Sequence, residues 1–164
     1  MKIQRREALG ALTAAAGSAL LPGSFAAGEP MFSAGHAGKE VVTGIGGLFF
    51  RARDPKTLAQ WYQDNLGVCV APQKLNDPVW QQQAGQTLFA PFPEKTGYFG
   101  DPVKQWMINF RVGDLDKLTG QLEASGIAVK VDATTYPNGR FAHMHDPEGN
   151  PIELWQPLNT TTPK

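Results

Sequence analysis

The stretch Asp146-Pro147-Glu148-Gly149-Asn150-Pro151-Ile152-Glu153-Leu154-Trp155 decides the fold of this chain. Its first five residues are rich in turn formers, and they stand between two runs of extended character, residues 140–145 and 151–156. Two such runs joined by a short turn predict a β-hairpin.

The length of the turn also predicts which side chains share a face of the hairpin. A five-residue loop at residues 146–150 sets His143 opposite Glu153, and directly opposed residues lie on the same face of a sheet. The alternate residues Ile152 and Leu154 are apolar and should face a core. The other face should therefore carry Glu153, His143, Phe141 and Trp155.

A repeat with an offset of sixty residues extends this pattern over most of the chain. The segment Phe50–Leu58 recurs as Phe110–Leu118, with Phe, Arg, Asp and Leu at matching positions. In each copy an extended run leads to an aspartate, Asp54 or Asp114, that is placed to cap a helix. Each predicted helix ends at a glycine, where a left-handed residue is favoured.

Both copies therefore predict a strand, a helix and three further strands. In the second copy the strands are expected at residues 106–113, 127–131 and in the hairpin. In the first copy the strands are expected at residues 45–53, 68–71, 79–83 and 87–92.

This βαβββ unit, used twice and ending in Asp-Pro-Glu-Gly-Asn-x-Ile-Glu-Leu, resembles the vicinal-oxygen-chelate superfamily, the glyoxalase and bleomycin-resistance type of domain. The resemblance covers residues 41–157, with modules at about 41–100 and 104–157. It implies an α+β fold in which two tandem βαβββ modules form a curved-sheet cup with the helices outside. Members include glyoxalase I, extradiol dioxygenases, fosfomycin-resistance transferases and metal-free bleomycin-binding proteins, so the fold alone does not decide the function.

The resemblance also implies where a metal would bind. Enzymes of the superfamily hold a divalent ion with side chains from the first and last strands of each module, and the matching positions here are Gly47, Phe89, Met107 and Glu153. Only Glu153 is a ligand for a hard metal ion. Gln83 or His143 could contribute if the alignment slips. No cofactor is expected, and Glu153 is the metal ligand if a divalent ion does bind.

Strand alternation predicts the rest of a ligand-binding cup. In addition to the hairpin residues, the inward-facing side chains should be Phe49, Arg51, Met107, Asn109 and Arg111. Glu153 and His143 are the candidate catalytic pair, since a carboxylate beside an imidazole suits general-base chemistry. The alternative is a structural ion pair of Glu153 with Arg51 or Arg111. These two arginines are either anchors for an anionic ligand or strand-end residues with exposed heads.

Charge and the N-terminal residues suggest where the protein acts. Lys and Arg total 15, as do Asp and Glu, so no net charge favours binding to nucleic acid. Residues 1–27 combine Arg5-Arg6, an apolar run too short for an ordinary membrane span, and small residues. This layout resembles a twin-arginine-type export signal. We expect cleavage, no membrane contact thereafter, and a periplasmic or secreted protein with a flexible leader at 28–40 and a tail at 158–164.

Three functions remain open on the sequence. The first is a protein that binds, and in one version transforms, a small molecule in its cup without the usual metal. The second is a divalent-metal-dependent lyase, isomerase or dioxygenase. The third is a non-catalytic interaction module. The small-molecule ligand is the expected partner, together with a second copy of the chain in a homodimer.

Overall fold

A computed structural model of the chain describes residues 40, 42–69, 74, 76–77 and 79–158. The predicted export signal and all of the leader except Glu40 lie outside the described residues, as does the tail after Leu158. The chain divides into two units, residues 1–50 and 51–164. In the first unit, the described residues form neither helix nor strand, and their side chains are exposed.

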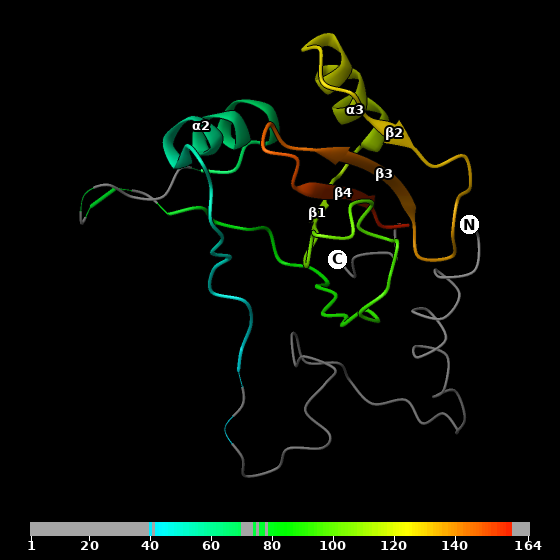
Figure 1. The fold of residues 1–164 in the computed structure, drawn as a ribbon, viewed down its shortest axis with the longest axis horizontal. Helices are drawn as coiled ribbons and strands as arrows, with labels where there is room; N and C mark the ends of the chain where they lie inside the picture. The colour runs from blue at the N-terminus through cyan, green and yellow to red at the C-terminus, as the bar shows by residue number, and fades with distance from the viewer. Residues whose placement is uncertain (1–39, 41, 70–73, 75, 78, 159–164) are drawn as a thin grey trace, which may run out of the picture. The chain divides into compact units, whose positions relative to one another are not determined.

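The second unit contains a four-stranded mixed sheet that forms from the second copy of the repeat (Figure 1). Strand β1 pairs in parallel with β4, which pairs antiparallel with β3, and β3 pairs antiparallel with the short β2. The elements in chain order are β1 (Ile108–Arg111), α3 (Leu115–Ala124), β2 (Lys130–Val131), β3 (Arg140–His145) and β4 (Pro151–Gln156). The βαβββ order predicted for this copy and the α+β class are both confirmed.

The register of the β3–β4 hairpin is the one that the turn length predicts. His143 lies opposite Glu153, Met144 opposite Ile152, and His145 opposite Pro151. The turn itself is closed by backbone hydrogen bonds from Asp146 to Asn150 O (3.0 Å) and from Gly149 to Asp146 O (2.9 Å).

Both helices begin at the aspartates that the repeat singles out. The side chain of Asp54 accepts a hydrogen bond from Thr57 N (3.1 Å) at the start of α2 (Pro55–Leu66). Asp114 accepts one from Lys117 N (2.9 Å) at the start of α3. These bonds satisfy backbone N–H groups that the first helical turn leaves unpaired. Helix α2 ends at Gly67, whose φ of 67° is left-handed, as expected for a C-terminal cap.

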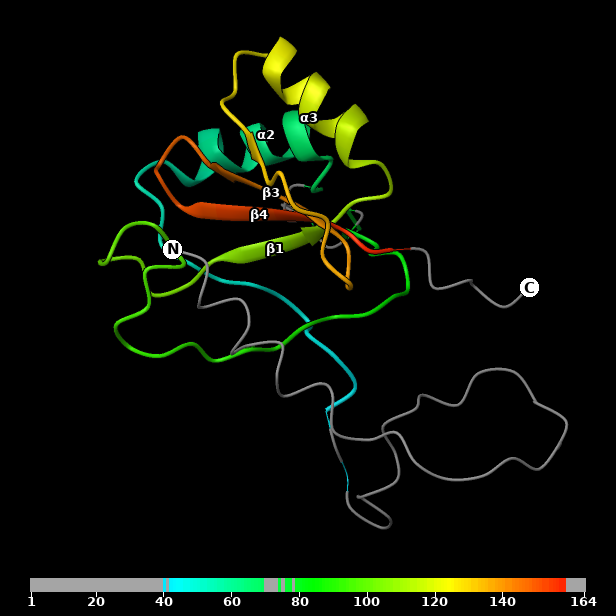
Figure 2. The ribbon, with the colours of Figure 1, turned by 90° about the vertical axis from the view of Figure 1, so that its right-hand side faces the viewer.

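The core of the second unit lies between the sheet and the two helices, which cover the same face of the sheet (Figure 2). Apolar side chains that alternate along β3 and β4 meet the apolar stripes of α2 and α3 there. The buried members are Leu58, Tyr62, Leu115, Leu122, Ala142, Met144, Ile152 and Leu154. No helix among the described residues is long and apolar enough to cross a membrane.

The turn between β3 and β4 also ties the hairpin to α2. Asp146 is buried and accepts hydrogen bonds from the Tyr62 hydroxyl (2.9 Å) and from Asn150 N (2.9 Å) and Nδ2 (2.7 Å). The Glu148 carboxylate accepts from the backbone N–H groups of Arg53 (2.8 Å) and Asp54 (3.0 Å), directly before α2. The Asp-Pro-Glu-Gly-Asn run thus has a structural role that its turn composition alone does not show.

The first copy of the repeat differs from the prediction. Its helix α2 forms, but the described residues of the expected strands 45–53, 79–83 and 87–92 form no strand. Of the expected strand 68–71, only residues 68 and 69 are described. A strand exists only where its N–H and C=O groups pair with a neighbouring strand. Residues 81–91 are exposed throughout, and an isolated hairpin is barely stable in water.

Candidate functional site

The candidate site lies on the face of the sheet opposite the helices, and it is organised in two rows across the strands. In the first, which we call the polar row, Asn109 of β1 pairs with Glu153 of β4, and Glu153 pairs with His143 of β3. In the second, the aromatic row, Arg111 pairs with Trp155, and Trp155 pairs with Phe141. Paired residues share a face, so the rows lie side by side.

The Glu153 carboxylate is the centre of the polar row. The side chain is buried, with 5% of the residue exposed. Its Oε2 accepts a hydrogen bond from the Asn109 amide (2.6 Å), and its Oε1 accepts a short one from the Tyr98 hydroxyl. Both of these donors are neutral, and they help offset the free-energy cost of removing a carboxylate from water.

The His143 imidazole lies between two carboxylates. Its Nε2 is 3.7 Å from Glu153 Oε1 and 3.6 Å from Asp132 Oδ1. Both distances are too long for a hydrogen bond but lie within ion-pair range, so both carboxylates would attract a protonated imidazole. The arrangement could bind a ligand N–H or O–H group, or move a proton between Glu153 and His143.

Tyr98 reaches the site from the linker between the two copies of the repeat. Its ring stacks on Phe92, with centroids 5.1 Å apart and an interplanar angle of 12°, and makes a T-shaped contact with the His143 ring, with centroids 5.9 Å apart. The linker backbone is held by its own turns, through hydrogen bonds from Thr96 N to Pro93 O and from Gly100 N to Gly97 O. Glu153 is thus covered by a side chain whose segment is no part of the sheet.

The aromatic row forms a flat apolar surface next to Glu153. Trp155 and Phe141 are nearly parallel, with an interplanar angle of 6° and centroids 6.3 Å apart. The Trp155 indole donates to the carbonyl oxygen of Asn138 (2.7 Å), which fixes the orientation of the ring. Phe141 is buried, with 8% of the residue exposed, and Trp155 is half-buried, so Trp155 is the ring of this row that a ligand can reach.

The structure brings together part of the predicted site. Glu153, His143 and Asn109 are in contact, with Phe141 and Trp155 beside them. The Arg111 guanidinium donates to the carbonyl oxygen of Gln83 (2.6 Å), and the arginine lies at the end of the aromatic row. Arg51 is exposed, and Met107 is half-buried just before β1. Phe49 belongs to the first unit, where 93% of it is exposed.

Two residues of the cluster were missed from the sequence, Tyr98 and Asp132. Tyr98 lies in a linker and Asp132 follows the very short β2, so no periodic pattern in the sequence places Tyr98 against Glu153 or Asp132 against His143. The one available signal for Tyr98 is an aromatic pair, Tyr98-Phe99, in a segment otherwise rich in turn formers.

The residues at the family's metal positions do not fit a divalent ion. Gly47 has no side chain, Phe89 has no lone pair, and the Met107 thioether suits soft ions. Both oxygens of Glu153 accept hydrogen bonds from neutral side chains. Within the described ranges, no group of three or more His, Cys, Asp or Glu side chains is placed to hold a metal ion.

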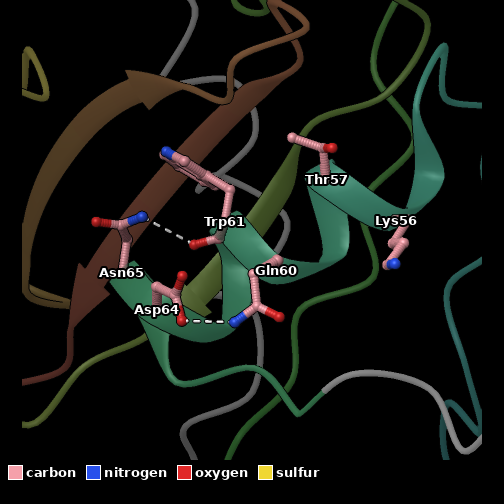
Figure 3. A pocket seen from close by; sticks show the side chains of 6 residues that line it. All are labelled: Lys56, Thr57, Gln60, Trp61, Asp64 and Asn65. Atoms are coloured by element: carbon pink, nitrogen blue, oxygen red, sulfur yellow. Dashed lines mark hydrogen bonds between the residues drawn. The ribbon is translucent and has the colours of Figure 1, made fainter.

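A separate hollow of about 490 Å³ lies along α2 (Figure 3). Two hydrogen bonds within the helix occupy polar groups of its lining, from Gln60 to Asp64 (2.7 Å) and from Asn65 to the Trp61 carbonyl oxygen (2.9 Å). All of the lining comes from this one helix: Lys56, Thr57, Gln60, Trp61, Asp64 and Asn65. The hollow is an indentation of the helix surface rather than a site with converging groups.

The comparisons with known proteins identify the family. A family model described as a glyoxalase-like domain matches residues 47–155. The chain belongs to the glyoxalase-like domain family. This membership confirms the resemblance that the repeat and the Asp-Pro-Glu-Gly-Asn run indicate.

Solved structures of this glyoxalase-like type are also similar to the chain. A glyoxalase/bleomycin resistance protein from Streptomyces sp. CB03234 is 37% identical over 30% of this chain and 42% of its own, with a TM-score of 0.28. TnmS3, described as an antibiotic binding protein from the same organism, is 26% identical over 64% of this chain and 88% of its own, with a TM-score of 0.42. A protein from the mobile metagenome of V. Pseudocholerae is 18% identical over 73% of this chain and 100% of its own, with a TM-score of 0.46.

The match to the first of these structures thus spans less than half of that relative's length. No curated protein matches the chain.

Proposed function

We propose that this glyoxalase-like protein binds a small organic molecule against the face of its sheet, without a metal of the family type. The Glu153 carboxylate and its neighbours Asn109 and His143 supply the polar contacts. Trp155 supplies the apolar contact, with the buried Phe141 ring packed beside it.

The observation that carries the proposal is the buried Glu153 carboxylate, set between a polar cluster and an aromatic wall. The helices complete the core on the opposite face, so packing of the sheet does not require a carboxylate at this position. A few converging polar groups on an otherwise aromatic surface are the usual composition of a small-molecule site.

The absence of a family-type metal from the proposal rests on donor chemistry. Three of the four family positions, Gly47, Phe89 and Met107, offer no suitable ligand atom for Zn²⁺, Fe²⁺ or Mn²⁺. Catalytic sites for these ions normally use about three protein ligands. Elemental analysis of protein purified without chelator should find well under one metal ion per chain. One tightly held divalent ion per chain, lost in Glu153→Gln, would instead support the metal-dependent alternative.

A thermal-shift screen of small aromatic alcohols, acids and amines tests ligand binding. A true ligand at a hundredfold excess over its Kd stabilises the folded protein by about 2.7 kcal/mol. Glu153→Gln keeps the size of the side chain but removes its charge, so we expect it to weaken binding roughly tenfold or more. Glu94→Gln, a change of the same kind at an exposed turn residue, is the matched control and should bind as the wild type does.

Two results of this screen would count against the proposal. If every hit stabilises the wild type and Glu153→Gln equally, the ligands bind elsewhere. If the screen is flat both for the wild type and for a variant with Tyr98 truncated to alanine, the proposed small-molecule site is wrong, and the result counts for the non-catalytic interaction module.

A further inference from the structure

The Tyr98 side chain has the contacts that a bound ligand would have. It comes from a linker rather than from the sheet, its ring stacks on Phe92, and its hydroxyl donates to the buried oxygen Oε1 of Glu153. The His143 ring makes a T-shaped contact with the same phenol. These are a stacking surface, a ring-edge contact and a charged acceptor, all placed around one phenol group.

We propose that Tyr98 occupies a subsite for a hydroxylated aromatic ring, and that such a ligand binds by displacing it. This inference rests on the proposed function and names the chemical class of the ligand. The incoming hydroxyl replaces that of Tyr98 on Glu153, and its ring takes the place next to His143. Asn109 continues to donate to Glu153 Oε2 (2.6 Å) and keeps the carboxylate in position.

Displacement of Tyr98 leaves the sheet intact. The linker turns close on themselves through bonds from Thr96 N to Pro93 O (2.9 Å) and from Gly100 N to Gly97 O (3.2 Å). Tyr98 N itself donates to Thr96 Oγ1 (3.2 Å). A rotation of the side chain therefore exchanges the bond to Glu153 without breaking a hydrogen bond between strands.

The direct test uses p-cresol, the side chain of tyrosine as a free molecule. Tyr98→Ala removes the phenol from the subsite, and a space vacated in this way can bind a molecule of the same shape. Titration followed by NMR should give Tyr98→Ala a Kd for p-cresol at least about tenfold lower than that of the wild type. Toluene lacks the hydroxyl and should bind Tyr98→Ala roughly ten- to a hundredfold more weakly than p-cresol does, as expected for a hydrogen bond to a charged group.

Three further variants check that the effect belongs to this subsite. Phe99→Ala removes a ring from the same linker but leaves the Tyr98–Glu153 bond, so it should bind p-cresol no better than the wild type. Tyr98→Ala combined with Glu153→Gln leaves only a neutral amide acceptor, so its preference for p-cresol over toluene should fall to about tenfold or less. Tyr98→Phe keeps the ring and removes only the hydroxyl, so it tests the same competition if Tyr98→Ala fails to fold. This variant should bind p-cresol more tightly than the wild type.

The outcomes separate this inference from the proposed function. Equal binding of p-cresol by Tyr98→Ala and the wild type, or no preference for p-cresol over toluene, would overturn the phenol subsite. If Glu153-dependent ligands still appear in the thermal-shift screen, the proposed function stands without it. If they do not appear, both are overturned.

Discussion

Tyr62 and Asp146 form a buried hydrogen bond of 2.9 Å between α2 and the β3–β4 turn, across 84 residues of sequence. Burial raises the pKa of the Tyr62 hydroxyl well above its ordinary value of 10, and the charge and hydrogen bond of Asp146 raise it further. The tyrosine therefore keeps its proton in the folded protein at pH values where a free tyrosine side chain loses it. At the scale of single residues, this bond joins the turn motif to the core.

Tyr62→Phe should lower the free energy of unfolding at neutral pH by about 1.5–3 kcal/mol, the usual value for a hydrogen bond to a charged group.

The same variant should also change how the stability of the protein responds to alkaline pH. In the unfolded chain the tyrosine ionises near pH 10, while in the folded protein it does not, so wild-type stability falls as pH rises above about 10. Urea unfolding between pH 7 and 11 should show that the free energy of unfolding falls less with rising pH in Tyr62→Phe than in the wild type. The same fall in both proteins would contradict this account.

At the scale of elements, Glu148 connects the hairpin to the start of α2. Its carboxylate accepts from two backbone N–H groups and lies 3.8 Å from the Arg53 guanidinium. The hydrogen bonds from Asp54 N and Arg53 N lower the pKa of Glu148 below its ordinary value of 4.5. Folding therefore favours the ionised form of Glu148, and the ionised carboxylate holds the start of α2 against the β3–β4 turn.

Glu148→Gln should make the protein less stable at pH 7 and flatten its response to acid. Because the pKa is lower in the folded state than in the unfolded one, the stabilisation is complete above about pH 4.5 and is lost as pH falls below it. The melting temperatures of the wild type and Glu148→Gln, measured between pH 3 and 7, test this expectation. The two melting temperatures should be similar at pH 3 and differ most at pH 7. A difference that is the same at every pH would refute the role of ionised Glu148.

At the scale of the whole molecule, large apolar side chains remain on the surface of the first copy of the repeat. Val79, Leu88 and Phe89 are more than half exposed, at 56%, 64% and 86%. Surface of this kind is often covered by a partner molecule. These residues lie in the expected strands 79–83 and 87–92, which pair with no other strand within the described part of the chain.

We expect the protein to form homodimers through this region. Analytical ultracentrifugation at micromolar concentration should show a dimer for the wild type. Phe89→Glu places a charge among the apolar residues and should shift the equilibrium towards monomer. Gln86→Glu adds the same charge at an exposed polar position nearby and should leave it unchanged, while a wild-type monomer at all concentrations would disprove the expectation.

Interactions between residues close together in the sequence account for the two helices and for the β3–β4 hairpin of the second copy of the repeat. The aspartate caps and glycine stops act within one helical turn, and the five-residue loop sets the pairing of His143 with Glu153 because a hairpin register depends on its own turn. The face shared by Glu153, Phe141 and Trp155 follows from the same two-residue alternation. These features depend on contacts between residues that are close in the sequence, so they could be predicted from the sequence alone.

Only the tertiary structure decided what surrounds Glu153 and which extended segments become strands. Tyr98 and Asp132 meet Glu153 and His143 through packing of segments that carry no periodic signal. The hydrogen bonds that Arg53 N and Asp54 N donate to the Glu148 carboxylate span more than ninety residues. The first-copy segments have strand-like alternation, yet pairing depends on a neighbouring strand, and a one-dimensional pattern does not supply one. Long-range contacts of this kind depend on where the whole chain places its elements.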